Sequence, residues 1–193
     1  MEMDTHILES FYNRTLPLFA PQAEKLLERL EPAMMQSLSF RYIFSVPAMI
    51  EISHIIEDAV LTSPRVAELH VSFQYLSRLV AQAARYKQIA EAAKGLWLYG
   101  IRDADIISML ANPQVYVIDT ANTPLVRYWY VVAYGPGLSM SLLAEESASL
   151  GEEERYYEGF YTFDPEVTYP LLTIMHQIYP DEVPAPLMPD QFG

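Results

Sequence analysis

The sequence contains no cysteine and only seven glycines. Without cysteine the chain cannot form disulfides, thiolate metal sites or a cysteine nucleophile. Its glycines form no phosphate-binding loop, and neither a G-x-S-x-G elbow nor an H-E-x-x-H motif is present. These absences argue against nucleophilic catalysis and metal chemistry, and we expect a non-catalytic protein with no cofactor.

Positive charge is also scarce. The chain has 12 Lys and Arg residues against 25 Asp and Glu, which gives a formal net charge of −13. The imbalance lies in the second half, where residues 103–193 carry 2 basic and 14 acidic side chains. Such a chain repels the phosphates of nucleic acids, so we expect no nucleic-acid binding. A protein partner with a basic surface fits this charge better.

Long hydrophobic runs are missing as well. The longest uncharged stretch, Tyr128 to Ala144, has 17 residues and is interrupted by Gly135-Pro136-Gly137. It therefore predicts a β-hairpin and not a membrane span. The first residues, Met1-Glu2-Met3-Asp4, carry acids where a signal peptide needs Lys or Arg. A cytoplasmic protein is the expectation.

The remaining composition is that of a folded domain, because 51% of the 193 residues are hydrophobic and a chain of this length buries a full core. Residues 1–39 predict a helical N-terminal extension, with one helix to about residue 14 and another over 21–31. Residues 40–179 predict one domain. Residues 180–193 form a Pro-rich acidic tail, which lacks the apolar surface needed to order itself.

Helical and strand patterns alternate within residues 40–179. Three- and four-residue spacings of apolar side chains predict helices, and period-two or wholly apolar segments predict strands. The predicted helices span 47–61, 75–94 and 165–179, and the predicted strands span 40–44, 66–73, 96–100, 115–118, 125–134, 138–144 and 160–163. This order indicates an α/β or α+β fold, with a single mixed β-sheet, packed helices and a C-terminal antiparallel meander.

The strand at 125–134 has two different faces. Alternation places Tyr128, Tyr130 and Tyr134 on one face and Trp129 on the other. Tyrosine rings with hydroxyl groups form an amphipathic surface. That surface suits an aromatic ligand or chromophore, a homodimer interface, or cover by a helix, and the pattern alone does not choose among the three.

Six segments occur in an order and spacing that resemble the DICT sensory domain, over about residues 40–178. They are Ile52-Ser53-His54-Ile55-Ile56-Glu57-Asp58, Ser72-Phe73-Gln74, Arg85-Tyr86-Lys87-Gln88-Ile89-Ala90, Trp129-Tyr130-Val131-Val132 with Gly135-Pro136, Leu142-Leu143-Ala144-Glu145-Glu146, and Glu158-Gly159-Phe160-Tyr161-Thr162-Phe163-Asp164-Pro165. The resemblance implies a non-catalytic sensory or interaction module. The family is associated with diguanylate cyclases and two-component systems, and with light responses, notably in cyanobacteria.

The resemblance also implies contacts with a partner protein, with a small ligand as a further expectation. An alternative from another class is a structural or assembly adaptor, in which the N-terminal extension and the tail dock on a larger complex. Deleting the tail would then abolish docking.

Several polar residues within these segments are candidates for contact with a ligand or partner. Glu57 is within reach of Arg85, either as a structural ion pair or as a switch. Gln74 lies at a strand end, where it can orient a ligand or cap a helix. The spacing of Glu51, His54 and Asp58 is better explained by a solvated helix face than by a metal site. The candidate contact residues are Glu57, Phe73, Gln74, Arg85, Tyr86, Tyr128, Trp129, Tyr130 and Glu146.

Overall fold

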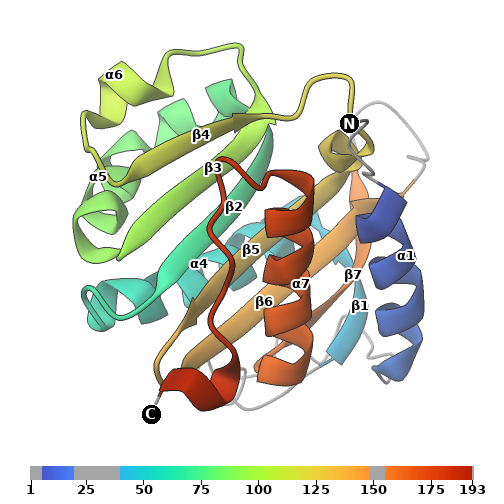
Figure 1. The fold of residues 1–193 in the computed structure, drawn as a ribbon. Coiled ribbons are helices and arrows are strands. Elements are labelled where there is room, and N and C mark those ends of the chain that lie inside the picture. Colours follow the sequence, from blue (N-terminus) through green and yellow to red (C-terminus); the bar gives the residue numbers. More distant parts are fainter. Residues whose placement is uncertain (1–5, 20–39, 148–154, 193) are drawn as a thin grey trace.

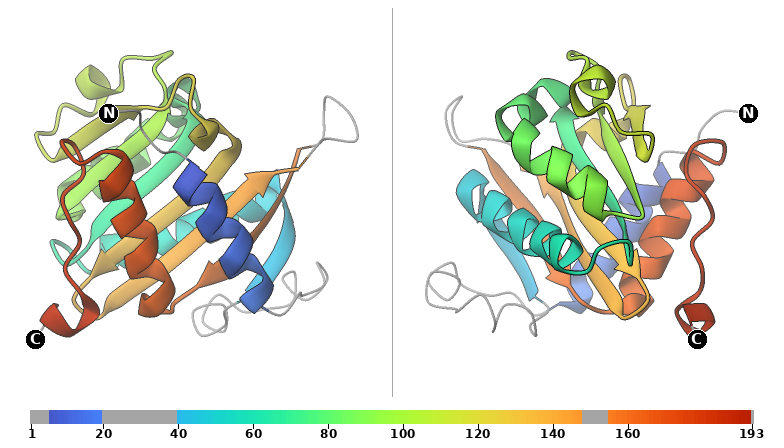
Figure 2. Two further views of the ribbon diagram at one scale, coloured as in Figure 1. Left: turned by 45° about the vertical axis from the view of Figure 1, so that its right-hand side comes forward. Right: turned by 90° about the vertical axis from the view of Figure 1, so that its left-hand side faces the viewer.

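The structure, a computed structural model, describes residues 6–19, 40–147 and 155–192 (Figure 1). One seven-stranded sheet forms its centre, and helices cover both faces (Figure 2). The predicted α/β fold with a single mixed sheet is confirmed. The helix predicted over 21–31 lies outside the described residues.

The strand order in the sheet is β1-β7-β6-β5-β2-β3-β4. The strands β2, β3 and β4, at one side of the sheet, are parallel, whereas β5, β6, β7 and β1 pair antiparallel, so the predicted C-terminal meander is present. The strands are β1 (Phe40–Ser45), β2 (Glu68–Tyr75), β3 (Gly95–Ile101), β4 (Val115–Asp119), β5 (Tyr128–Gly135), β6 (Leu138–Glu146) and β7 (Tyr156–Thr162).

Each face of the sheet is covered by its own set of helices. On one face α4 (Val46–Thr62) packs over the antiparallel strands, and α5 (Ala83–Ala92) and the short α6 (Ile106–Leu110) pack over the parallel strands β3 and β4. On the other face α1 (His6–Thr15) and α7 (Pro165–Ile178) lie beside each other (Figure 1). Between the helices and the sheet lie two separate hydrophobic cores, one on each face.

Proline and capping residues begin the two longest helices where the sequence predicts. Ser45 caps α4 by accepting a hydrogen bond from the Ala48 N–H, and Asp164 caps α7 by accepting from the Glu166 N–H over 2.9 Å. Pro165 occupies the first turn of α7, where its missing N–H costs nothing. The Asp164 cap is as predicted.

The long helix predicted over 75–94 is divided in two. Its first part is a 3₁₀ helix, η2 (Leu76–Gln82), and only the second part is the α-helix α5. Leu76 and Leu79 are both fully buried, which matches the three-residue period of a 3₁₀ helix. Val80, which the α-helical pattern places in the apolar face, is 51% exposed.

The tyrosine face of β5 is covered by helices. Tyr128 and Tyr130 are 1% and 0% exposed, and they belong to the core beneath α1 and α7. Tyr12 of α1 packs edge to face on Tyr128, with ring centroids 5.6 Å apart. The period-two division of β5 is therefore confirmed, and of the three alternatives for this face the structure shows helix cover.

The Pro-rich tail lies along the same face, where the sequence alone predicts no order. The Trp97 Nε1–H donates to the Glu182 carbonyl over 3.0 Å, and the Tyr134 hydroxyl donates to the Leu187 carbonyl over 2.8 Å. Val183 is 2% exposed. The domain itself supplies the apolar surface and the hydrogen-bond donors that the tail lacks.

Candidate functional site

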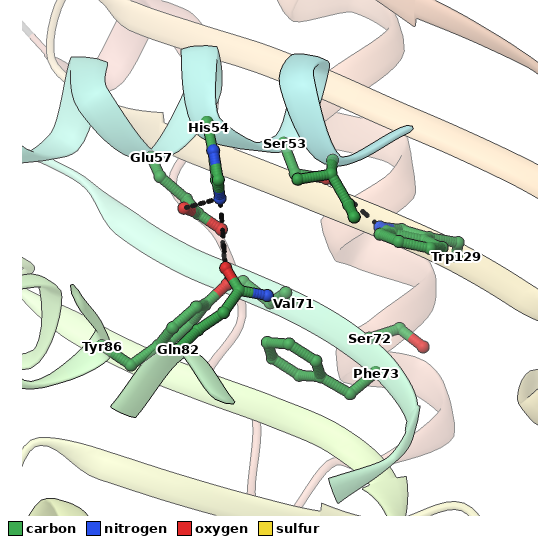
Figure 3. Close-up of a pocket in the computed structure, with 10 residues that line it drawn as sticks. Ser53, His54, Glu57, Val71, Ser72, Phe73, Gln82, Tyr86 and Trp129 are labelled. Atoms are coloured by element: carbon green, nitrogen blue, oxygen red, sulfur yellow. Dashed lines mark hydrogen bonds and ion pairs between the residues drawn. The ribbon is translucent and has the colours of Figure 1, made fainter. Parts of the chain in front are cut away.

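A cleft of about 390 Å³ opens on the α4 side of the sheet, between α4, the end of β2, η2 and β5. We call it the α4 cleft. Its inner end adjoins a void of about 10 Å³, which has room for no more than one water molecule (Figure 3). The residues that line the α4 cleft are Val46, Ile50, His54, Ser72, Phe73, Arg78, Ala81, Gln82, Trp129 and Arg155.

The α4 cleft forms because β2 separates from β5. The two strands pair only as far as Val71 opposite Val131. Beyond that point the register of β2 against β3 shifts between Ser72 and Gln74, which is a β-bulge, and Gln74 has a φ of 60°. The Ser72 hydroxyl donates to the Tyr128 carbonyl over 2.9 Å and so ties the diverging strands together.

Gln74 connects four elements beside the α4 cleft. Its side chain is buried, and its Nε2 donates to Glu146 Oε2 on β6 over 2.8 Å. Its Oε1 accepts from the Tyr157 hydroxyl on β7 over 3.0 Å and from Arg78 Nη1 on η2. These bonds replace the strand pairing that β2 has lost at this end, so Gln74 holds the open sheet together.

A second buried network lies at the inner end of the α4 cleft. The Glu57 carboxylate is 1% exposed, and it accepts from the Tyr86 hydroxyl over 2.5 Å and from Arg85 Nε. Arg85 Nη2 also donates to the His54 carbonyl over 3.1 Å and to Asp58 Oδ1 over 2.8 Å. The predicted meeting of Glu57 and Arg85 occurs, and it joins α4 to α5.

Burial and this network fix the protonation of both partners of Glu57. Burial, together with the adjacent Glu57 charge, raises the pKa of Tyr86 well above its usual value, so the phenol stays neutral and donates. Burial lowers the pKa of Arg85, but its hydrogen bonds to Glu57 and Asp58 outweigh that effect and raise the pKa. Arg85 therefore stays charged.

The walls of the α4 cleft are fixed by local contacts. The Trp129 Nε1–H donates to the Ser53 hydroxyl over 3.2 Å, and Ser53 in turn donates to the Met49 carbonyl over 2.7 Å. On α4, His54 Nε2 donates to Gln82 Oε1 of η2 over 3.1 Å (Figure 3). The cleft thus has a rigid aromatic wall and a polar bridge between α4 and η2.

Most of the residues singled out from the sequence meet around this cleft. Phe73 and Trp129 line it, and Glu57 and Tyr86 line its inner void. Arg85 donates to Glu57, Gln74 accepts from Arg78, and Glu146 is joined to the cleft only through Gln74. Tyr128 and Tyr130 do not join them, because alternation along β5 directs both rings to the opposite face, beneath α1 and α7. The residues brought together are Glu57, Phe73, Gln74, Arg85, Tyr86, Trp129 and Glu146.

Of the ten lining residues, the sequence reasoning named only Phe73 and Trp129 as candidate contacts; those it missed include Ile50, Arg78, Gln82 and Arg155. A weak signal existed for Arg78, which is a cation four residues after Gln74. Arg155 is one of only two basic residues in the acidic half of the chain, and that isolation is the signal that points to it.

Two side chains of the predicted solvated face of α4 hydrogen-bond to other elements of the domain. Asp58 is bound to Arg85, and His54 is bound to Gln82. Across residues 6–19, 40–147 and 155–192, no group of three or more His, Asp or Glu side chains could hold a metal ion. Among the same residues no helix has both the length and the apolar character of a membrane span.

The described chain is thus an α/β/α sandwich with a lined cleft and two buried polar networks, and the comparisons with known proteins identify its family. Residues 24–147, more than half of the chain, match the family model described as "Sensory domain in DIguanylate Cyclases and Two-component system", DICT. The chain belongs to the DICT family. The match begins within the predicted N-terminal extension and ends before the Glu158–Pro165 segment.

Solved structures show a similar fold. A polyphosphate kinase from Porphyromonas gingivalis superposes with a TM-score of 0.56 at 11% sequence identity, over 86% of this chain and 30% of the kinase. At that identity the likeness concerns the fold alone, and this chain spans less than a third of the kinase. No curated protein matches.

Proposed function

We propose that this chain is a non-catalytic sensory module in which the α4 cleft receives a small molecule and contacts with a partner protein carry the response. One observation supports this most: four residues chosen from separate sequence segments, Glu57, Phe73, Tyr86 and Trp129, line the α4 cleft or its inner void, and Gln74 and Glu146 hydrogen-bond to each other beside it. All of these residues lie within residues 24–147, which match a family of sensory domains, and this supports a role for them in sensing.

The hydrogen bonds of the cleft favour binding over catalysis. A serine nucleophile needs a base to take its proton. Here the Ser53 hydroxyl donates to the Met49 carbonyl and the Ser72 hydroxyl donates to the Tyr128 carbonyl. His54 is bound to Gln82 and not to either serine. These groups fix the walls of the cleft.

A change in the cleft has a direct physical route to the rest of the sheet. Arg78 lines the cleft and donates to Gln74, which contacts β6 through Glu146 and β7 through Tyr157. A ligand that moves Arg78 therefore alters the bonds that hold β2 to the meander. The acidic half of the chain, with its net negative charge, suits a partner with a basic surface.

The tail contacts bear on the adaptor alternative. The backbone carbonyls of Glu182, Val183 and Leu187 already accept hydrogen bonds from side chains of the same domain. The donors are Trp97, His176 and Tyr134, respectively. A partner that captured the tail would first have to break these contacts. The contacts of the tail, residues 180–192, therefore do not favour the adaptor alternative.

The proposal is tested by filling the cleft. Ala81→Trp places an indole in the α4 cleft, and Ile107→Trp adds the same group at an exposed position on α6. Each tagged chain is incubated with an extract of its native host at physiological salt, and the retained proteins are identified by mass spectrometry. We expect Ala81→Trp to change the recovery of a specific partner severalfold, and Ile107→Trp to leave that recovery unchanged.

Two outcomes contradict the proposal. One is that no protein is specifically retained by the wild-type chain. The other is that the partner is retained equally by the wild type and by Ala81→Trp, with both folded by circular dichroism. Equal retention combined with its loss on deletion of residues 180–193 would favour the adaptor reading instead.

A further inference from the structure

The walls of the α4 cleft are largely apolar. Val46, Ile50, Phe73, Ala81 and Trp129 provide aliphatic and aromatic surface on three sides. A volume of about 390 Å³ falls within the range of sites that enclose small organic molecules. The Trp129 ring is held in place through Ser53 and by its edge-to-face contact with Tyr157, with ring centroids 5.4 Å apart. A fixed indole beside an open space suits a flat ring system.

The charge of the cleft is opposite to that of the chain. Arg78 and Arg155 both line it, and none of the described lining residues carries a carboxylate. The chain as a whole has a formal charge of −13, and Arg155 is one of two basic residues after residue 102. Both guanidinium groups carry a positive charge, so each attracts an anion that enters the cleft.

Arg78 retains hydrogen-bond donors for such an anion. Its Nη1 donates to Gln74 Oε1 and, over 3.5 Å, to the Phe73 carbonyl, and its guanidinium lies 5.1 Å from the centre of the Tyr75 ring. No carboxylate among the described residues forms an ion pair with it within 4.0 Å. A guanidinium has five N–H donors, and the bonds to Gln74, Phe73 and the Tyr157 side chain leave about two of them for a ligand. A positioned guanidinium with two adjacent donors matches a carboxylate in bidentate geometry.

The opposite end of the cleft offers nothing to an anion. The inner void is about 10 Å³, and the carboxylate beside it, Glu57, is buried. An anionic group is therefore repelled from that end, while the ring system to which it is attached is accepted by the apolar walls. The two ends together set the orientation of a ligand.

We infer that the α4 cleft binds a small aromatic anion, with its ring system against Phe73 and Trp129 and its acidic group on Arg78, opposite Arg155. This inference rests on the proposed function, because it names the class of ligand for the same cleft. It adds a charge requirement, which the proposed function does not have.

Three probes of nearly equal shape separate charge from apolar contact: 1-naphthoate, 1-naphthylmethanol and 1-naphthylmethylamine. Binding to the full chain is measured by isothermal titration calorimetry at constant ionic strength. We expect the naphthoate to bind at least about tenfold more tightly than the alcohol, since a charge-assisted bidentate pair is worth at least that factor. The amine should bind most weakly. In a Trp97→Phe variant, Trp129 is the remaining tryptophan, and its fluorescence should respond to naphthoate.

Variants identify the groups responsible. Arg78→Gln should weaken naphthoate binding by about 10- to 100-fold and change binding of the alcohol by less than about threefold. Arg14→Gln removes the same charge from exposed α1, on the opposite face, and should leave all three affinities unchanged. Arg155→Gln is a second test, which does not disturb the bond between Arg78 and Gln74.

The inference is overturned if naphthoate does not bind, if the alcohol or the amine binds as tightly as naphthoate, or if neither arginine variant weakens naphthoate binding. These outcomes differ from a failure of the proposed function. If all three probes bind equally and Ala81→Trp abolishes their binding, the cleft remains a ligand site and only the charge requirement is wrong. The proposed function fails separately, in the partner experiment.

Discussion

Replacing Glu57 by Gln tests the buried network that joins α4 to α5. Gln keeps the shape of the side chain but turns one accepting oxygen into an NH₂ group. That group faces either Arg85 Nε, which cannot accept, or the Tyr86 hydroxyl, which can accept only by turning its own O–H away. The change therefore leaves one donor without its acceptor and removes the charge that assists the bond from Arg85.

The expected cost follows from the burial of the site. Breaking a fully buried ion pair costs about 3–5 kcal/mol. Arg85 is 25% exposed and keeps its bond to Asp58, so part of that cost is recovered, and we expect a loss of about 3 kcal/mol. For a domain of this size the melting temperature should fall by about 6–12 °C.

Urea unfolding followed by circular dichroism measures the loss in free energy directly. Asp58→Asn is the matched control, because Asp58 contacts the same arginine but is 63% exposed, and it should cost less than about 1 kcal/mol. The double variant with Tyr86→Phe should lose less than the sum of the two single losses, because both act on one network. A Glu57→Gln protein within about 0.5 kcal/mol of wild type would refute the reasoning.

Three further predictions concern other parts of the fold. A Cβ on Gly159 would lie 2.4 Å from a backbone oxygen, so Gly159→Ala should lower the free energy of unfolding in urea by about 1–3 kcal/mol. Gly137 has no atom near its Cβ position but has a φ of 69°, so Gly137→Ala should lower it by about 1 kcal/mol. Val183→Ala should lower the melting temperature and Leu187→Ala should not, because only the first side chain is buried; equal melting temperatures would show that the tail is not docked. Burial lowers the pKa of His70, so the folded state binds fewer protons than the unfolded state below about pH 6.5. The free energy of unfolding should therefore fall as the pH is lowered from 7 to 5. A His70→Asn variant with the same dependence of stability on pH would contradict this assignment.

Local patterns predicted much of the fold, and the physical reason is that they depend on neighbours in sequence. Period-two alternation along β5 assigns Trp129 and Tyr130 to opposite faces, as the structure shows. The same rule separates Glu145 from Glu146: Glu145 pairs with Arg127 over 3.4 Å, and Glu146 accepts from Gln74. The cap and proline at the start of α7 are equally local signals.

The features that required the structure depend on long-range packing. Alternation shows that Tyr128 and Tyr130 share a face, but the cover of that face comes from α1, more than 100 residues away in the sequence. The tail is ordered by side chains of the domain, such as Trp97 and Tyr134, which its own composition does not reveal. Nor does sequence spacing indicate that Gln74 meets Glu146, 72 residues later.

The α4 cleft itself has a cause that no local pattern encodes. If β2 stayed paired with β5 beyond Val71, the strands would close the space that Phe73 and Trp129 now line. The bulge and the positive φ of Gln74 prevent that pairing, and a residue other than glycine at such a φ is strained. The hydrogen bonds of the Gln74 side chain offset the strain by joining β2 to β6 and β7. The opening of the cleft and the connection to the meander thus depend on the same side chain. A ligand that moves Arg78 would therefore change the hydrogen bonds that Gln74 makes to β6 and β7.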